Sequence, residues 1–258
     1  PEVVGRWSWW RHSTAQRKQQ EKVGSSDPLC LVNTKQSHHA KGSVTMTAQL
    51  VYFADPMCSW CWGFKPTLLA VLDRYGANLP LRMIMGGLRP GTTEPMDAEQ
   101  KAKTRGHWEQ VQEASGQPFS FNFFDQDGFV YDTEPACRAV VAGGDLAPEH
   151  VFGLLIAIQA GFYEENRDVT DPEVLADLAL DAGYDRDEFL DRFDDPKVIQ
   201  ATQDGFKLSQ SVGITGFPTL LIGDDDNGYD LVCAGYQRPD AVIGRIGQWL
   251  AQNAEASS

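Results

Sequence analysis

The sequence predicts an α/β protein in which a β-α-β unit and a β-β-α unit are separated by a large helical insertion. Three observations support this prediction. A helical pattern links two strand-like runs between residues 49 and 85, two further strand-like runs meet at an Asn-Gly turn, and the section between them is mainly helical. A helix that connects two strands in this way implies that the strands are parallel.

The first unit consists of two strand-like runs with a helix between them. Residues 49–54 form a short apolar run, and residues 79–85 form a second one that ends at a Gly-Gly pair. Between them, apolar side chains recur at helical spacing, at Phe64, Leu68, Val71, Leu72 and Tyr75. Gly76 is expected to end this helix, and Pro66 is expected to kink it because proline lacks a backbone N–H.

The middle section, about residues 92–211, is predicted to be the helical insertion. Three helices are expected within it, over residues 148–163, 172–182 and 196–212. The second of these begins with the pair Asp171-Pro172, which supplies an N-cap and a proline at the first helical position.

Two other segments of the insertion have a distinctive composition. The loop over residues 118–131 carries five phenylalanines, at Phe119, Phe121, Phe123, Phe124 and Phe129. Such a cluster is typical of a core, and the alternative is a groove for unfolded chains. The acidic residues between 185 and 195 are interpreted as a solvated face.

The second unit returns to strand patterns. Residues 217–222 and 229–234 are apolar runs separated by a polar turn that contains Asn227-Gly228, which is a strong hairpin signal. A last helix is expected to begin near Pro239. The predicted order is therefore β-α-β, helical insertion, β-β-α.

Composition excludes several classes of protein. The chain has 258 residues and 42% hydrophobic residues, enough for one core with an inserted subdomain. Its formal net charge of −14 would repel a phosphate backbone, so we expect no nucleic-acid partner. No run approaches the roughly 20 apolar residues that a membrane span requires, so we expect no membrane association.

The N-terminal segment differs from the rest of the chain. Residues 1–44 hold seven Lys or Arg and three Asp or Glu, and show neither helical nor strand periodicity. Met46 precedes the first strand-like run, so we expect residues 1–45 to be a disordered or non-native extension and residues 46–258 to form the domain. A basic arm is the alternative. The segment lacks the continuous apolar run of a secretory signal, which predicts a cytoplasmic protein.

Cysteine usage points to thiol chemistry. Five cysteines are present, at Cys30, Cys58, Cys61, Cys137 and Cys233. In a reducing cytosol, closely spaced cysteines are more often catalytic or metal-binding than structural, and only Cys58 and Cys61 are close in sequence. Cys137 and Cys233 lie in apolar runs and are expected to be small buried side chains.

The position of Cys58 suits a nucleophile. It lies where the first strand gives way to a helix, and the unpaired N–H groups of a helix N-terminus stabilise a thiolate. Cys61 follows one helical turn later and is expected to be more buried, as the resolving thiol. Cys58 would attack a substrate disulfide, and Cys61 or a substrate thiol would resolve the mixed disulfide.

Half of a zinc site is the alternative interpretation of a Cys-x-x-Cys pair. A closed zinc site needs about four ligands, and no second Cys-x-x-Cys pair or suitably placed histidine pair accompanies this one. We therefore expect no metal.

A second motif supports the same chemistry. The run Thr-Gly-Phe-Pro-Thr, residues 215–219, precedes a predicted strand, where a proline is tolerated. With the Cys-x-x-Cys pair, the chain resembles the thioredoxin fold, and more closely the DsbA family, over about residues 48–251. The resemblance implies that Pro218 is cis and packs against the active-site disulfide, and that Phe217 presents backbone groups to a substrate chain. An ordinary trans-proline is the alternative.

Two longer runs resemble the FrnE-like subgroup of protein-disulfide isomerases. These are Asp-Pro-Met-Cys-Ser-Trp-Cys-Trp-Gly-Phe, residues 55–64, and Tyr-Asp-Thr-Glu-Pro-Ala-Cys-Arg, residues 131–138. Ser59 and Trp60 replace the Pro-His pair of DsbA itself, so a strongly oxidising potential is not implied.

Other residues near the pair have weaker assignments. Ser59 and Trp60 are candidate substrate-binding residues, and we expect Trp60 to be exposed and Trp62 to pack in the interior. Asp55 could accept a proton near Cys61, or could belong to an ordinary turn and cap pair, and both interpretations stay open.

The sequence therefore predicts a thiol-disulfide oxidoreductase or isomerase acting on cysteine-containing proteins or peptides. No bound cofactor is expected, and glutathione or a thioredoxin-type system is the expected electron partner. One alternative is a glutathione-dependent enzyme of the kappa-class transferase or 2-hydroxychromene-2-carboxylate isomerase type, although those typically have Ser at the position of Cys58. Another is a redox-independent holdase chaperone.

Overall fold

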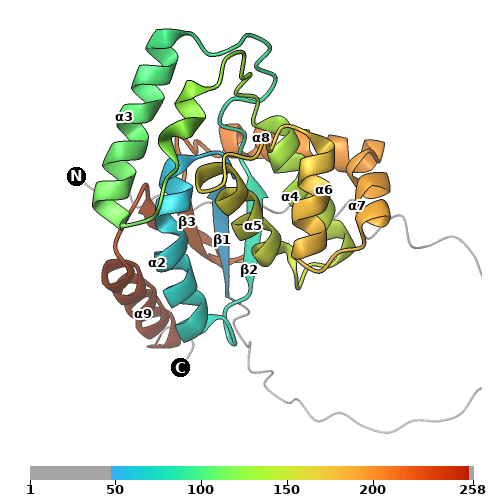
Figure 1. Ribbon diagram of the computed structural model, residues 1–258. Helices are drawn as coiled ribbons and strands as arrows, with labels where there is room; N and C mark the ends of the chain where they lie inside the picture. The colour runs from blue at the N-terminus through green and yellow to red at the C-terminus, as the bar shows by residue number, and fades with distance from the viewer. Residues whose placement is uncertain (1–47, 256–258) are drawn as a thin grey trace, which may run out of the picture.

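A four-stranded sheet forms the centre of the fold in the computed structural model of the chain, which describes residues 48–255 (Figure 1). The strands lie in the order β2-β1-β3-β4, with bounds Leu81–Met85, Gln49–Ala54, Thr219–Asp224 and Gly228–Ala234. β1 pairs parallel with β2, whereas β3 pairs antiparallel with β1 and β4. The predicted extension, residues 1–45, lies outside the described residues.

Successive residues of β1 face two different layers. Tyr52 belongs to the large core cluster that α2 (Ser59–Tyr75) and α9 (Pro239–Glu255) share with the sheet. Phe53 faces a second cluster, which the end of α8 (Pro196–Ser211) completes. Because both faces of the sheet are covered, β1 is apolar along nearly its whole length.

Along the chain, the long helical insertion lies between β2 and β3, as the sequence predicts, and in space β1 pairs directly with β3 (Figure 1). Its elements are α3 Ala98–Ser115, the 3₁₀ turn η1 Phe121–Asp125, α4 Glu134–Leu146, α5 Val151–Tyr163, α6 Pro172–Asp181, α7 Arg186–Phe193 and α8. Helices α4 to α7 pack together beside the sheet, while α3 packs against α2. The β-α-β, insertion, β-β-α order is therefore confirmed.

Three helices of the insertion were not predicted: α3, α4 and α7. α3 is polar along most of its length, but Asp97 and Gln100 form a capping box at its start. α7 occupies the acidic segment that was interpreted as a solvated face. Asp185 caps it, and the acidic side chains of the segment are exposed apart from the half-buried Asp195, so the solvated-face interpretation is confirmed for them. Phe189 and Phe193 are buried on the other side of the helix, which the sequence analysis did not predict.

The phenylalanine-rich segment is part of the core. Phe123, Phe124 and Phe129 are buried, and the rings of the segment gather around Trp108 of α3 and Phe162 of α5. These rings meet mainly edge to face, which suits aromatic packing. The core interpretation is therefore confirmed.

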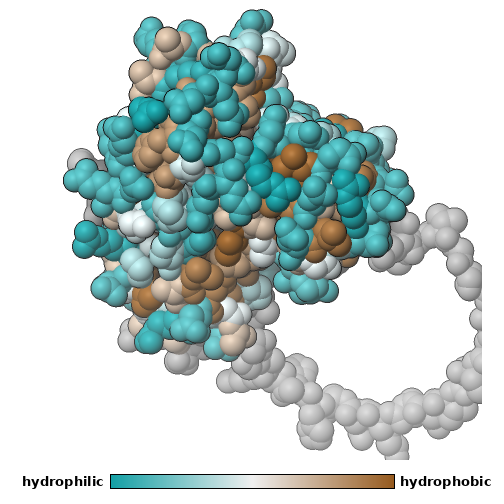
Figure 2. Space-filling view, in the orientation of Figure 1, coloured by the Kyte–Doolittle hydropathy of each residue, from teal (hydrophilic) through white to brown (hydrophobic). Residues whose placement is uncertain are grey.

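The molecular surface is mostly hydrophilic on the face shown in Figure 2, with hydrophobic patches over α2 and near α6. Exposed apolar side chains of these helices include Leu69 in α2 and Leu180 in α6. No helix within residues 48–255 is long and apolar enough to cross a membrane.

Candidate active site

Cys58 is the N-cap residue of α2. Its backbone is extended, with φ −90° and ψ 113°, and its carbonyl accepts the N–H groups of Cys61 and Trp62, which starts the helix. A tight turn delivers the chain to this point, because the Cys58 N–H donates to the Asp55 carbonyl and the Met57 N–H donates to the Asp55 carboxylate. The sulfur therefore lies at the positive end of the helix dipole.

Both thiols of the pair are free and buried, with exposed fractions of 5% for Cys58 and 1% for Cys61. Burial raises the pKa of the Cys61 thiol well above its ordinary value of 9.0, and a hydrogen bond with Cys58 raises that pKa further. Cys61 therefore keeps its proton at neutral pH. Cys58 is the more exposed of the two thiols, so its sulfur is the outer one.

The loop before β3 lies directly against Cys58. The Cys58 Sγ lies 3.5 Å from the Phe217 carbonyl oxygen, the Phe217–Pro218 peptide bond is cis, and Pro218 is buried. On its other side, the half-buried Phe217 ring packs so closely on Gly86 that a Cβ there would lie 2.1 Å from it. Residues more than 150 positions apart in the chain thus meet at the sulfur.

The two residues between the cysteines are partly accessible. Ser59 and Trp60 are half-buried, and the Trp60 ring lies 5.7 Å from the ring of Tyr236. The expectation that Trp60 is exposed is therefore only partly correct, since Tyr236 covers one side of it. Trp62 packs in the interior as expected: it is fully buried, and its indole N–H donates to the Pro118 carbonyl.

Asp55 is completely buried, and its carboxylate accepts several hydrogen bonds. Its oxygens accept the N–H of Met57 at 2.8 Å, the N–H of Leu88 at 2.6 Å and the thiol of Cys137 at 3.4 Å. Burial raises the pKa of its carboxyl group above the ordinary 3.8, and the bond from Leu88 partly offsets that shift. These contacts fit the turn interpretation, and proton acceptance stays a prediction.

Three buried tyrosines near the dithiol were missed in the sequence: Tyr52, Tyr131 and Tyr163. Burial raises the pKa of Tyr52 well above 10.0, and Cys61 is the next largest cause. The Tyr131 hydroxyl donates to the Met57 carbonyl at 2.7 Å. Tyr131 opens one of the runs that carry the family resemblance, so it could have been singled out. Tyr52 and Tyr163 lie in apolar runs that give no such signal.

Cys137 and Cys233 are buried as predicted. Within residues 48–255, no group of three or more His, Cys, Asp or Glu side chains is arranged to hold a metal ion.

A family model, that of the DSBA-like thioredoxin domain, matches residues 49–247 of the chain. The match covers both halves of the sheet and the insertion between them.

Two solved structures are similar over most of the fold. A Nitrosomonas europaea protein described as a "putative protein disulfide isomerase" is 38% identical, with a TM-score of 0.75, and the alignment covers 80% of this chain and 98% of that one. The cytosolic disulfide reductase DsbM from Pseudomonas aeruginosa is 26% identical, with a TM-score of 0.66, and 79% of this chain and 99% of that one are covered.

The chain also resembles curated proteins described as ClpXP adapter protein SpxH. The Bacillus subtilis protein is 24% identical over 183 residues, which covers 70% of this chain and 60% of that protein. The chain thus spans about 60% of the length of this relative.

Proposed function

Because the chain belongs to the family of DSBA-like thioredoxin domains, we propose that it is a thiol-disulfide oxidoreductase acting through Cys58 and Cys61. The observation that carries the proposal is the pair of free thiols at the start of α2, with the outer sulfur 3.5 Å from the Phe217 carbonyl. The similarity to a disulfide reductase and to a protein assigned as a disulfide isomerase supports it. Its substrates are cysteine-containing proteins or peptides.

The reaction is a pair of sulfur exchanges. The Cys58 thiolate attacks one sulfur of a substrate disulfide, a bond to that sulfur forms, and the other substrate sulfur leaves as a thiolate that takes up a proton. Cys61 then loses its proton and attacks the Cys58 sulfur, which releases the second substrate thiol and closes the Cys58–Cys61 disulfide. The substrate gains two electrons that the dithiol loses, and the reverse sequence oxidises a substrate dithiol.

The backbone at Phe217 and Pro218 and the half-buried Trp60 flank the sulfur, and we assign them to the binding of substrate. Ser59 belongs to the same surface. Glutathione or a thioredoxin-type system is the proposed electron partner. A structure of DsbM with GSH, 27% identical with a TM-score of 0.65 and covering 79% of this chain and 99% of that one, supports the first of these. A reducing cytosol is the proposed compartment, as described for DsbM.

Trapping of the mixed disulfide tests the proposal. A Cys61→Ser variant retains the nucleophile but cannot resolve the intermediate, so it should accumulate one covalent adduct per chain with a disulfide-containing peptide. Peptide mapping by mass spectrometry should locate the adduct at residue 58. The matched Cys58→Ser variant should form none. An adduct of equal yield in both variants would refute the assignment of Cys58 as the nucleophile.

The direction of the reaction follows from the redox potential. Equilibration of the wild-type protein with glutathione buffers, followed by trapping of free thiols, should give a single two-electron transition. A potential near or above about −200 mV indicates an oxidant or isomerase, and one near about −270 mV indicates a reductant. If no disulfide forms at any buffer composition, the dithiol mechanism is wrong.

The two rival functions predict different variant behaviour. A glutathione transferase would form a thioether with an electrophile, and Cys61→Ala would leave that reaction intact. A holdase would suppress aggregation of an unfolded protein even when both cysteines are replaced by Ser. We expect neither result.

A further inference from the structure

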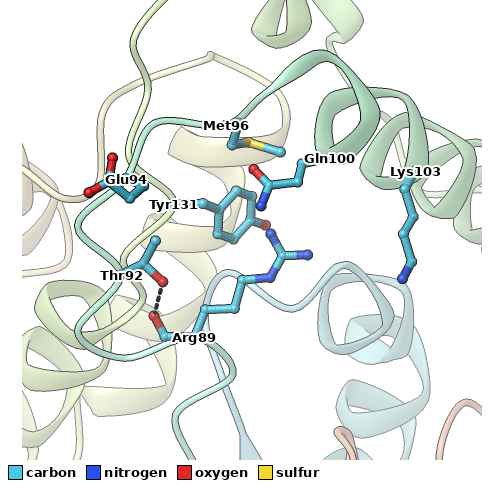
Figure 3. Close-up of a pocket in the computed structure, with 7 residues that line it drawn as sticks. All are labelled: Arg89, Thr92, Glu94, Met96, Gln100, Lys103 and Tyr131. Atoms are coloured by element: carbon cyan, nitrogen blue, oxygen red, sulfur yellow. Dashed lines mark hydrogen bonds between the residues drawn. The ribbon is translucent and has the colours of Figure 1, made fainter.

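A pocket of about 260 Å³ lies between the loop after β2 and helix α3 (Figure 3). Tyr131 lines it, and the hydroxyl of Tyr131 donates to the carbonyl of Met57, the residue before Cys58. Arg89 lines it as well, and the residue before Arg89 donates to Asp55 of the active-site turn. One direct hydrogen bond from a pocket residue, Tyr131, and one from Leu88, the neighbour of Arg89, thus connect this part of the fold to the turn that carries the nucleophile.

The pocket has an excess of positive charge, although the chain as a whole carries a net charge of −14. Arg89 and Lys103 supply two cations and Glu94 one carboxylate. In Figure 3 the Glu94 side chain lies on the opposite side of Tyr131 from Lys103. Among residues 48–255, neither Arg89 nor Lys103 forms an ion pair with a carboxylate, although six other Lys and Arg side chains do.

Two donors of the pocket, Arg89 and Gln100, are held in place by contacts within the protein, whereas Lys103 is exposed. The Arg89 guanidinium lies 4.8 Å from the centre of the Tyr131 ring, and the Arg89 backbone N–H donates to the Thr133 hydroxyl at 3.1 Å. The side-chain oxygen Oε1 of Gln100 accepts the backbone N–H of Asp97 at 3.0 Å, so the side-chain NH₂ group of Gln100 stays available as a donor. In Figure 3 that side chain extends towards Tyr131 and Arg89.

We propose that this pocket binds the carboxylate of a low-molecular-weight thiol or of its disulfide, while the sulfur of that ligand reacts with Cys58. The proposal rests on the thiol-disulfide exchange proposed above. Arg89 and Lys103 pair with the carboxylate, and Gln100 donates to it. The volume is slightly below the range of roughly 300–1,000 Å³ typical of ligand pockets, which suits one arm of a small molecule better than a length of polypeptide.

The exchange with such a ligand balances without another reactant when the protein starts reduced. Cys58 thiolate forms a bond to one sulfur of the small disulfide, whose S–S bond breaks and whose other half leaves as a thiolate that is protonated by solvent. Cys61 then gives up its proton, attacks Cys58 and releases the second half. One small disulfide becomes two thiols, and the protein dithiol becomes a disulfide.

Three small disulfides that differ mainly in charge test the proposal. They are 3,3′-dithiodipropionate, which is anionic, bis(2-hydroxyethyl) disulfide, which is neutral, and cystamine, which is cationic. Reduced protein is mixed with each, and the second-order rate constant is measured from the loss of free thiol. For Arg89→Gln and for Lys103→Gln, the ratio of the anionic to the neutral rate constant should fall about tenfold, because a charge-assisted hydrogen bond is lost.

Lys101→Gln is the matched control, because it removes the same charge from the same helix. Lys101 faces Asp127 and the Gln126 carbonyl and does not line the pocket. That variant should keep the wild-type ratio. If Lys101→Gln lowered the ratio of the anionic to the neutral rate constant by the same factor, the effect would be one of general charge, and the proposed subsite would be wrong.

The outcomes also separate the subsite from the function on which it rests. If the wild-type protein reduces the neutral and anionic disulfides but the Arg89 and Lys103 variants keep the wild-type ratio, the subsite is wrong and thiol-disulfide exchange stands. If the wild-type protein reacts with none of the three, both proposals fail.

Discussion

The backbone N–H of Leu88 donates to the Asp55 carboxylate at 2.6 Å, across 33 positions of sequence. The other oxygen of the same carboxylate accepts the Met57 N–H within the active-site turn. One buried side chain therefore fixes the turn before Cys58 relative to the loop that follows β2. Because Arg89 lies in that loop, the proposed nucleophile and the proposed carboxylate subsite share one anchor.

The first prediction concerns the pH dependence that Asp55 gives to folding. Burial raises the pKa of this carboxyl above the ordinary 3.8, so the folded state holds its proton more tightly than the unfolded chain. The free energy of unfolding should therefore fall as pH rises above about 3.8, because the unfolded chain releases the proton first. Asp55→Asn has no carboxyl group at this position, so its free energy of unfolding should lack this pH-dependent contribution.

Urea unfolding of the wild-type protein and of Asp55→Asn, at several pH values between about 4 and about 7, measures this pH dependence. The variant loses the acceptor for the Leu88 N–H, which costs about 1–3 kcal/mol at any pH. The stability difference between wild type and variant should therefore shrink as pH rises. A difference that stays constant over this range would contradict the raised pKa.

The second prediction concerns the reactivity of Cys61. Its thiol is buried, and burial is the largest cause of its raised pKa, so the shift should persist without Cys58. In Cys58→Ser at about pH 8, Cys61 should react with iodoacetamide at least about tenfold more slowly than in the same protein unfolded in urea, because one pKa unit changes the thiolate fraction tenfold. Mass spectrometry of the peptide that contains residue 61 measures the rate. Equal rates in the folded and unfolded protein would contradict the burial of this thiol.

The sheet and the helices next to it could be predicted because their signals are local. β1 is apolar along a continuous run, and the β3–β4 turn ends at Gly228, whose φ of 89° is a conformation that glycine adopts readily. α3 and α7 escaped prediction because each buries only two or three side chains, too few for a clear helical period. Their N-caps, Asp97 and Asp185, were the available signal.

The site divides in the same way. Cys58, Cys61 and Pro218 lie in motifs that can be read from the sequence, and the structure brings them together around one sulfur. Arg89 and Tyr163 could not be assigned, because long-range contacts bring them near the turn: Leu88, next to Arg89, donates to Asp55, and the packing of the insertion brings Tyr163 close to Cys58. Long-range contacts of this kind leave no periodic trace in a single sequence.

The third prediction separates core from surface in the aromatic segment. Phe123 is 3% exposed and contacts Trp108, Phe129 and Phe162, so Phe123→Ala should lower the free energy of unfolding by about 3–5 kcal/mol. Phe121 is half-buried at the edge of the cluster, and Phe121→Ala should cost less, about 1–2 kcal/mol. Urea unfolding measures both. If Phe123→Ala left stability unchanged but abolished binding to an unfolded protein, the groove interpretation would be favoured.

The fourth prediction tests how closely the loop after β2 supports the cis-proline loop. A Cβ at Gly86 would lie 2.1 Å from the Phe217 ring, so Gly86→Ala must displace that ring, and we expect the carbonyl next to Cys58 to shift with it. We expect a loss of about 1–3 kcal/mol in the free energy of unfolding, as for other overpacked sites. The rate of mixed-disulfide formation should also fall, because the backbone beside the sulfur is displaced.

Gly216→Ala is the matched control for this prediction. Gly216 precedes Phe217 directly, yet a Cβ there would meet nothing within 4 Å, so this variant should change stability by no more than about 0.5 kcal/mol. Stopped-flow exchange with a peptide disulfide and urea unfolding, applied to both variants, give the comparison. If Gly86→Ala matched Gly216→Ala in both measurements, the Phe217 ring would not depend on Gly86, and the loop after β2 would not position the backbone at Cys58. A slower exchange in Gly86→Ala alone would show that this contact holds the Phe217 carbonyl at the sulfur.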